Sequence, residues 1–323
     1  MTVVTYAVVD SGTTTTRLRL WDGARVAWSG SVAAGARDTA IDGAPTAIRA
    51  AIADLLARVT AETEARPAAV VCSGMITSNL GLHEVPHLRA PAGPRDLAAG
   101  IVRVAFPDLG ELAFVPGVKT QPGELTLGTL ASGDVLRGEE AEIAGLRARL
   151  DLRGPVTFLH FGSHHKAIDV DGEGRITASR SAITGELLAA VGAHTILKSS
   201  VVPLEELALD PAAALAGADA ALAEGLGRSL FLVRVGEQLG RQPRERMTSY
   251  LLGALATLDL PLLPPPGSAR IVLYGHGFFP EVLALLLARS GGHDVVRVDG
   301  ATADAAAVEG AVALYELAAG ASE

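Results

Sequence analysis

Hydrophobic and polar residues alternate through the opening part of the chain, a spacing that is typical of β-strands with one buried face. Two alternating runs, Thr5 to Val9 and Arg17 to Trp21, flank a short polar stretch that contains Gly12. A third run, Arg25 to Val32, carries the alternation further. The pattern predicts an antiparallel hairpin that a third strand extends.

The spacing then changes from that of strands to that of a helix. Between Pro45 and Arg66 the chain is rich in alanine, and its apolar positions recur at the interval of one helical turn. The next segment, Ala68 to Ser73, is a short apolar run that predicts a buried strand. Hairpin, third strand, helix and strand therefore follow one another in that order.

The same order of elements returns after Pro155, with further strand and helix patterns behind it. In chain order these segments read VTFLHFGSHH, KAIDVDGEG, RITASRSA, TGELLAAVGAHTIL, ARIVLYGHG, PEVLALLLARSG, HDVVRVDG and TADAAAVEGAVALYELAA. Such a repeat predicts an α/β protein of two duplicated lobes, which usually close over a ligand in the cleft between them. We expect an N-terminal lobe over residues 1–135 and a C-terminal lobe over residues 136–323. The pattern leaves open that the last helix packs back towards the first lobe.

Length, hydrophobic content and charge narrow the class of protein. At 323 residues, 49% of them hydrophobic, the chain is long enough for two domains. The net charge is −9 and the basic residues are scattered, which disfavours nucleic acid as a partner. Mean hydropathy is +0.33, yet no apolar run reaches the ~18 to 20 residues of a membrane span.

Localisation follows from the start of the chain and its cysteine content. No secretion signal precedes the first strand, and a single cysteine, Cys72, fits a reducing compartment. We therefore expect a cytoplasmic protein that binds small molecules and has no membrane partner. The sequence leaves a homodimer open.

The polar turn between the first two strands carries the first candidate chemistry. Asp10, Gly12, Thr13 and Thr14 stand there in the order D-S-G-T-T. Glycine allows a positive φ, the amides of such a turn can face an anion, and hydroxyls suit phosphate oxygens. A carboxylate at the edge of the turn suits a hydrated divalent cation such as Mg²⁺. On these residues alone, an ordinary hairpin turn with polar residues stays open as the alternative.

Other common phosphate and metal motifs do not fit the sequence. The segment Gly117 to Thr120 matches only the last part of a Walker phosphate loop, and the G-H-G at 275–277 is too short for a dinucleotide fingerprint. His160, His164 and His165 are close in sequence, but no carboxylate or thiol stands beside them at metal-ligand spacing. We predict no metal site apart from nucleotide-bound Mg²⁺.

A pair of adjacent acids provides a candidate general base. Glu139 and Glu140 follow Gly138 at the start of a predicted helix, where the helix dipole favours a carboxylate. Such a carboxylate can accept the proton of an attacking hydroxyl. Glu139 is the first choice and Glu140 the second. The alternative is that both are solvated acids of a first helical turn.

Several segments resemble, in order, one family over nearly the whole chain. They read SGMITSNLGLHEVPHLRAPAG, FVPGV, DVLRGEEAEIAG, FGSHHK, RSAITGEL and PRERMTSYLLGAL. The family is that of the 2-dehydro-3-deoxygalactonokinases, within the superfamily of sugar kinases, actin and heat-shock chaperone ATPases. The resemblance implies two ribonuclease-H-like lobes with an interlobe cleft. It also implies that phosphates are bound by one turn at Asp10–Thr14 and a second at Gly162–Lys166.

The chain departs from the family pattern at a few positions near these turns. Phe161 and Ser163 stand where the family usually has Pro and Thr in a P-G-T-H-x-K pattern. Leu82 replaces an aromatic residue, and the segment 275–277, through His276, replaces a Gly-Thr or Gly-Gly pair. These differences could alter nucleotide binding or the choice of substrate.

The residue chemistry and the resemblance together give a set of predicted site residues. Asp10 would hold Mg²⁺ through water, and Glu139 would accept the proton. The residues expected at the phosphates and adenosine of the nucleotide are Gly12, Thr13, Thr14, Gly162, Ser163, His164, Lys166, Gly275 and Gly277. The residues expected at the sugar acid are Ser78, Asn79, Arg137, Thr184 and Glu186. Thr184 and Glu186 also fit a simple helix-capping arrangement, which is the safer interpretation.

These expectations describe an ATP-dependent kinase with Mg²⁺. By the resemblance, its acceptor is 2-dehydro-3-deoxy-D-galactonate, phosphorylated on the terminal hydroxyl to the 6-phosphate. Two alternatives stay open on the sequence. One is a hydrolase of the same fold, in which the glutamate activates water against a phosphoanhydride. The other is a nucleotide-binding switch without turnover.

Overall fold

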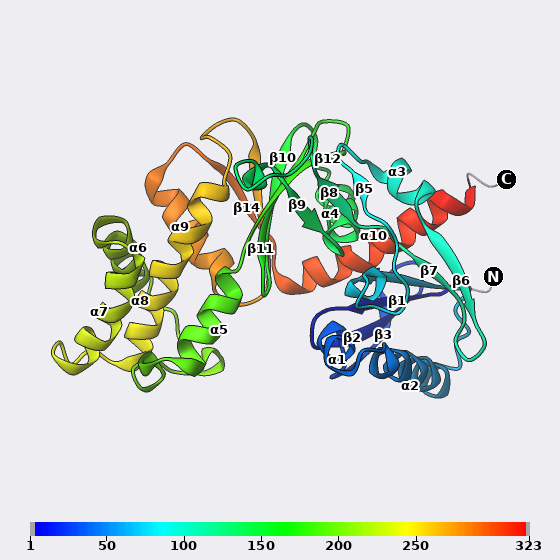
Figure 1. Ribbon diagram of the computed structural model, residues 1–323, viewed down its shortest axis with the longest axis horizontal. Coiled ribbons are helices and arrows are strands. Elements are labelled where there is room, and N and C mark those ends of the chain that lie inside the picture. Colours follow the sequence, from blue (N-terminus) through cyan, green and yellow to red (C-terminus); the bar gives the residue numbers. More distant parts are fainter. Residues whose placement is uncertain (1–3, 321–323) are drawn as a thin grey trace. The chain divides into compact units, whose positions relative to one another are not determined.

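A computed structural model describes residues 4–320 of the chain, which divide into two compact units (Figure 1). The first unit takes in the chain up to Gly154, Val170–Ser179 and the chain from Ala301 on. The second unit consists of Pro155–Asp169 and Arg180–Gly300. This division differs from the expected boundary at residue 135, because residues 136–154 and nearly all of the last helix belong to the first unit. The cleft expected between the lobes stays a prediction.

The first unit is built on a six-stranded mixed sheet with the strand order β3-β2-β1-β4-β7-β6. β1 pairs antiparallel with β2 and parallel with β4, so the chain turns back once and then crosses over. The strands are β1 (Tyr6–Ser11), β2 (Thr16–Trp21), β3 (Val26–Val32), β4 (Ala69–Gly74), β6 (Val102–Phe106) and β7 (Gly110–Phe114). The predicted hairpin, third strand and buried strand are confirmed.

Helices and a smaller sheet complete the first unit. Helix α2 packs against β2 and β3 (Figure 1). Its fully buried residues Ile48, Ile52, Leu55 and Val59 recur at helical spacing, and burying each such side chain contributes about 1.5–3 kcal/mol. The helices are α1 (Ala36–Asp42), α2 (Thr46–Thr63), α3 (Pro94–Ala99), α4 (Glu139–Arg149) and α10 (Gly300–Gly320), with single turns η1 (Met75–Thr77) and η2 (Leu130–Ser132). The smaller sheet consists of β5 (Leu88–Arg89), β8 (Val118–Thr120) and β9 (Asp134–Leu136).

Helices α4 and α10 cross in direct backbone contact. A Cβ atom at Gly145 of α4 would lie 1.8 Å from the carbonyl oxygen of Ala306, and one at Gly310 of α10 would lie 1.8 Å from that of Ala141. No side chain fits at either glycine without separating the helices. The crossing fixes α4, which carries Glu139 in its first turn.

Replacing Gly145 with alanine is expected to lower the free energy of unfolding by about 1–3 kcal/mol, because the new methyl group overpacks the crossing. Gly192 of α5 is a matched control, since a Cβ there has no atom within 4 Å. Gly192→Ala is expected to be neutral or slightly stabilising. Urea unfolding followed by circular dichroism measures both, and equal transitions for the two variants would contradict the close crossing.

The second unit repeats the topology of the first. Its five-stranded sheet has the order β12-β11-β10-β13-β14, with β13 parallel to β10 and to β14. The strands are β10 (Val156–Phe161), β11 (His165–Val170), β12 (Ile176–Ala182), β13 (Arg270–Gly275) and β14 (Asp294–Arg297). The last residue of β11 and β12 up to Ser179 fall within the first unit. The order β3-β2-β1-β4 in the first sheet corresponds to β12-β11-β10-β13 in the second, with the last strand of each series parallel to its neighbour. This correspondence confirms the predicted duplication.

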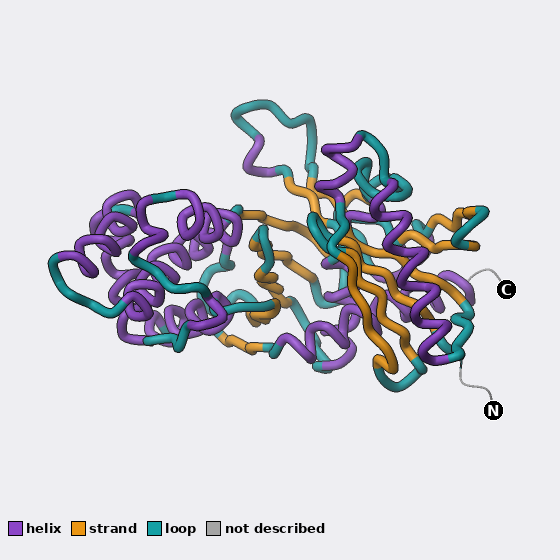
Figure 2. Tube along the Cα trace, turned by 90° about the horizontal axis from the view of Figure 1, so that it is seen from below, coloured by secondary structure: helices purple, strands orange, loops and turns teal. Residues whose placement is uncertain are grey.

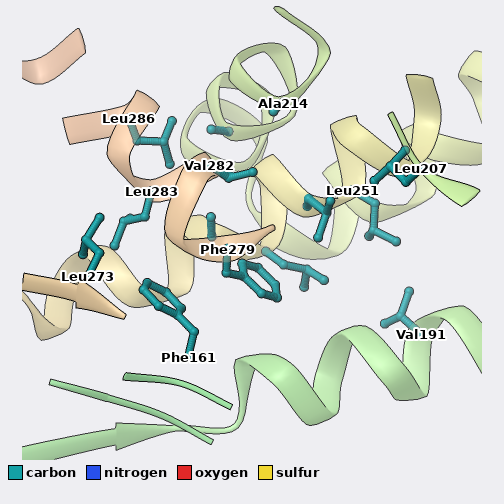
Figure 3. Packing of buried hydrophobic residues seen from close by; sticks show 14 of the residues in the cluster. Phe161, Val191, Leu207, Ala214, Leu251, Leu273, Phe279, Val282, Leu283 and Leu286 are labelled. Carbon is teal, nitrogen blue, oxygen red and sulfur yellow. The ribbon is translucent and has the colours of Figure 1, made fainter. Parts of the chain in front are cut away.

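Four helices of the second unit, α6 to α9, pack together (Figures 1 and 2). Helices α6 to α8 lie in the chain between β12 and β13, and α9 lies between β13 and β14. A large apolar cluster lies at their base, where Phe161, Leu273 and Phe279 meet leucines of the helices (Figure 3). The helices are α5 (Thr184–His194), α6 (Pro211–Glu224), α7 (Leu226–Gln238), α8 (Arg244–Ala256) and α9 (Phe279–Ser290), with short turns η3 (Ile196–Ser199), η4 (Leu204–Glu206) and η5 (Thr257–Leu262). This cluster lies directly behind the second predicted phosphate turn.

Within residues 4–320, no single helix combines the length and apolar character needed to cross a membrane. One pair of helical segments, Thr184–His194 and Ile196–Glu206, does so by length and composition only, and it is bent by 70°.

Cys72 lies in the middle of the first sheet, and burial raises the pKa of its thiol. In the folded chain the thiol therefore stays protonated, while the unfolded chain releases the proton near the ordinary pKa of 9.0. Rising pH consequently stabilises the unfolded state. The contribution of the protonated Cys72 thiol to the free energy of unfolding is therefore complete below pH 9.0 and is lost as the pH rises above it. Between pH 7 and pH 10 the unfolding free energy should fall by about 1–2 kcal/mol more than in Cys72→Ala. Parallel pH profiles from urea titrations would contradict this expectation.

Candidate functional site

The first predicted phosphate turn joins β1 and β2. Gly12 donates its amide to the carbonyl of Thr15 at 2.9 Å, which closes the turn. Asp10 belongs to β1 itself, where it pairs with Ser73 of β4, and its side chain is 37% exposed. The carboxylate thus lies at the end of a parallel strand, a usual place for ligand-binding groups in α/β sheets.

Helix α1 holds this turn from behind. The amides of Ala36 and Arg37 donate to the carbonyls of Gly12 and Thr13 at 3.1 and 2.9 Å. A Cβ at Gly35 would lie 2.6 Å from the backbone of the turn, so a residue without a side chain is required there. The turn is therefore rigid, and the exposed Thr14 stands on its outer side.

Gly74, at the end of β4, brings Asp10 close to the next segment of the site. Its φ is +83°, and a Cβ there would lie 2.7 Å from Oδ1 of Asp10 and 2.8 Å from the carbonyl oxygen of Ser11. A Cβ at Gly138 would lie 3.1 Å from Cα of Gly74. Two glycines thus let three backbone segments meet beside the Asp10 carboxylate.

Glu139 begins α4 directly after this contact. Its side chain is 7% exposed, and Oε2 accepts a hydrogen bond from the amide of Arg137 at 3.0 Å. The location agrees with the predicted start of a helix, where the helix dipole stabilises a carboxylate. Burial contradicts the alternative that this residue is a solvated surface acid.

Glu140 has a different environment from Glu139. It is 1% exposed, and its two carboxylate oxygens accept hydrogen bonds from the amides of Val118 and Gly138 at 2.8 and 2.7 Å. A carboxylate with both oxygens bound to backbone amides holds structure together and is a poor proton acceptor. The geometry therefore favours Glu139 over Glu140 as the base.

Arg137 was expected to pair with a substrate carboxylate, but its guanidinium is engaged within the unit. Nη1 donates to the carbonyl and hydroxyl of Thr77, both at 2.5 Å, and Nη2 donates to the carbonyl of Val85 at 2.9 Å and contacts His87 at 3.1 Å. Burial lowers the pKa of Arg137, and the charges of Glu140 and Glu84 oppose this. These contacts favour a positioning role for Arg137, since it fixes the segment after β4.

The other predicted sugar-acid residues of the first unit lie on that segment. Ser78 is buried, and its hydroxyl donates to the carbonyl of Met75 at 2.7 Å, whereas Asn79 is exposed. A Cβ at Gly81 would lie 2.1 Å from the carbonyl oxygen of Ile76, which shows how tightly the segment folds back. Leu82 packs against the apolar core of the unit.

In the second unit, the turn Gly162–His164 follows β10, and its three residues are exposed. The amide of Glu186 in α5 donates to the carbonyl of Ser163 at 2.9 Å, and the Glu186 carboxylate lies 3.4 Å from Nε2 of His164. A Cβ at Gly185 would lie 2.1 Å from the carbonyl oxygen of Gly162. The start of α5 thus presses on this turn as α1 presses on the first one.

The late glycine turn lies beside it, because Gly275 of β13 pairs with Phe161 of β10. Gly275 has a φ of +127°, and a Cβ there would lie 2.4 Å from the carbonyl oxygen of Phe161. Gly277 has a φ of +81° with open space around it, and His276 between them is exposed. Two predicted nucleotide turns therefore share one end of the second sheet.

Two further predicted residues of the second unit lie near the turn. Lys166 is half-buried on β11. Thr184 is not a helix cap: Ile183 is the N-cap of α5 and no side chain caps it, while the Thr184 hydroxyl donates to the buried Asp259 at 2.8 Å. The capping interpretation is therefore wrong for Thr184, because a stronger acceptor lies within reach.

Each unit thus brings together its own part of the predicted site. The first unit gathers Asp10, the Gly12 turn and Glu139, with Arg137 and Asn79 on neighbouring segments. The second unit gathers the turns at 162–164 and 275–277 with Glu186. Sequence reasoning missed Gly74 and Asp259. A glycine directly after the predicted strand could have indicated the first, whereas no motif marks the second.

The fold is that of the actin-like ATPase and sugar kinase class. A crystal structure of a candidate 2-dehydro-3-deoxygalactonokinase from Sinorhizobium meliloti is similar, with a TM-score of 0.73 and 25% identity over 98% of both chains. Component A of the (R)-2-hydroxyglutaryl-CoA dehydratase of Acidaminococcus fermentans shares the fold, with a TM-score of 0.54 and 14% identity over 98% of this chain and 99% of that one.

The sequence profile of the 2-keto-3-deoxy-galactonokinase family matches residues 10–314, so the chain belongs to this family of sugar kinases. It is 28% identical to the 2-dehydro-3-deoxygalactonokinase of Escherichia coli (strain K12) over 252 residues, which are 77% of each chain. The resemblance in the sequence segments is confirmed.

Proposed function

We propose that this protein transfers the γ-phosphate of ATP to the terminal hydroxyl of 2-dehydro-3-deoxy-D-galactonate and forms the 6-phosphate. The observation that carries the proposal is the buried Glu139, held at the start of α4 where Gly138 lies close to Gly74, the glycine beside the Asp10 carboxylate. Family membership supports the substrate class. We place the enzyme in the cytoplasm, where ATP is formed and a lone thiol stays reduced.

In this mechanism Glu139 accepts the proton of the sugar-acid hydroxyl as its oxygen attacks the γ-phosphorus. The O–H bond breaks, a new O–P bond forms, and the bond from the γ-phosphorus to the bridging oxygen breaks to release ADP. The hydrogen bond from the Arg137 amide fixes the Glu139 carboxylate, so little reorganisation precedes proton transfer.

The two turns bind the phosphates of the nucleotide in this proposal. Amides and hydroxyls at Gly12, Thr13 and Thr14 suit the β- and γ-phosphates, and the exposed turn at 162–164 offers further donors. Asp10 would hold Mg²⁺ through water, because its partly exposed carboxylate suits a hard, hydrated cation. When bound, Mg²⁺ neutralises charge on the phosphates.

For the sugar acid, the exposed Asn79 is the best placed of the predicted contacts. Its amide can donate to and accept from hydroxyl and carboxylate groups. Arg137 acts indirectly, because its Nη atoms hold the segment that presents Asn79. Replacing it with lysine would keep the charge but lose the forked geometry.

An acceptor screen with the purified chain tests the proposal. The protein is incubated with ATP, Mg²⁺ and a panel of stereoisomeric keto-deoxy sugar acids, and ADP is followed. We expect ADP only when 2-dehydro-3-deoxy-D-galactonate or a close isomer is present. ADP and phosphate without an acceptor would identify a hydrolase, and nucleotide-dependent stabilisation without ADP would identify a switch. Either outcome overturns the proposal.

A further inference from the structure

Asp259 is a fully buried carboxylic residue in η5 of the second unit, and no part of the proposed mechanism uses it. Its Oδ1 accepts the hydroxyl hydrogen of Thr184 at 2.8 Å, and its Oδ2 lies 2.7 Å from Nδ1 of His165. Thr184 and His165 are each 1% exposed. The hydrogen-bonding atoms of these three buried side chains therefore pair with one another and not with solvent.

The surroundings of this group are apolar and aromatic. The His165 ring makes edge contacts with Phe161 and Phe279, at centroid distances of 4.9 and 4.6 Å. Phe161, which stands in place of the family's usual proline, thus packs against the histidine. Burying ionisable groups in such a core is costly unless they are paired.

Asp259, His165 and Thr184 connect the two elements that flank the second phosphate turn. His165 is the first residue of β11 and follows the turn at once. Thr184 is the first residue of α5, whose next two residues press on the turn through Gly185 and the Glu186 amide. One carboxylate therefore ties together the two elements that hold Gly162–His164.

We infer that Asp259 is a positioning residue, which through His165 and Thr184 fixes the turn at 162–164 in the conformation that binds nucleotide phosphates. The inference rests on the proposed function for its ligand. The carboxylate does not touch the nucleotide. It orients the exposed amides and side chains of the turn from behind, as the hydrogen-bond partners of metal-binding side chains orient those side chains.

The test compares Asp259→Asn with a matched variant, Thr248→Val. Asn keeps the shape of the side chain but cannot accept hydrogen bonds from both partners. Thr248 lies in α8, is 2% exposed, and accepts the amide of Val202 at 2.9 Å, so its loss removes a buried hydrogen bond away from the turn. Both variants should have a lower melting temperature than the parent, because each loses buried hydrogen bonding.

Nucleotide affinity separates the two variants. ADP binding is measured by titration calorimetry, and we expect Asp259→Asn to weaken it about tenfold, because misplacing the turn by a fraction of an ångström is enough. Thr248→Val should bind ADP as the parent does. Hydrogen exchange of the peptide covering 161–166 should accelerate in Asp259→Asn only.

If Asp259→Asn does not fold, Thr184→Val takes its place, since it replaces the hydroxyl that donates to Asp259 with a methyl group. Unchanged ADP affinity relative to Thr248→Val overturns the inference. A parent chain that binds ADP but phosphorylates no sugar acid overturns the proposed function instead, and leaves the calorimetric comparison valid. The two failures are therefore distinguishable.

Discussion

Replacing Glu139 with glutamine is expected to lower kcat by about a thousandfold, because general-base catalysis contributes about 10²–10⁴ and an amide cannot accept the proton. The substitution keeps the size of a side chain that is 7% exposed, and its amide oxygen can still accept the Arg137 amide. The KM for ATP should therefore stay close to that of the parent. Initial rates with the sugar acid at saturating ATP measure the effect.

A matched control lies two positions beyond the adjacent pair of acids. Glu142 belongs to the same first turn of α4, but no step of the mechanism assigns it to the proton. Glu142→Gln should retain most of the kcat, whereas Glu139→Gln should not. If both variants turn over at similar rates, the base has been assigned to the wrong residue.

The second large effect is expected from Gly74→Ala, which should lower kcat about a hundredfold because it displaces the Asp10 carboxylate. The new methyl group would lie 2.7 Å from Oδ1 of Asp10 and 2.8 Å from the carbonyl oxygen of Ser11, both too close. The backbone has little room to relax, since Gly138 lies so close that a Cβ there would be 3.1 Å from Cα of Gly74. Steady-state rates over a range of Mg²⁺ concentrations measure the effect.

Gly110→Ala separates the site effect from backbone strain. Gly110 has a φ of +77°, close to the +83° of Gly74, but a Cβ there has no atom within 4 Å. Both positions have a positive φ, which a residue with a side chain adopts only under strain, so both variants should lose stability. Only Gly74→Ala should lose activity beyond that common loss of stability, and a Gly110→Ala variant that is equally inactive would contradict the assignment.

The sequence predicts the framework of this protein well because period-two and helical patterns are local signals. The hairpin around Gly12 and the strands before Gly74 and Gly275 lie within one or two residues of their predicted bounds. The repeat of the pattern along the chain predicted a duplication, and the two sheets show it as a shared order of their hairpin, third and crossover strands. The identity of the family followed from short segments whose order and spacing agree.

The sequence does not predict contacts between residues that are far apart along the chain. Arg137 was expected to face a substrate carboxylate, yet its guanidinium bonds to Thr77 and Val85, more than fifty positions away. Thr184 was interpreted as a cap, yet its hydroxyl bonds to Asp259. In both cases the side chain is a donor that many oxygen atoms could accept. Only the fold decides which of these acceptors lies within hydrogen-bond distance.

The most direct measurement of the central claim is the ³¹P spectrum of the product formed from ATP and 2-dehydro-3-deoxy-D-galactonate. The account predicts a phosphomonoester resonance split by the two protons of a terminal CH₂ group, together with one ADP for each ester formed. A spectrum that contains only ADP and inorganic phosphate, or an ester on a secondary carbon, would contradict it.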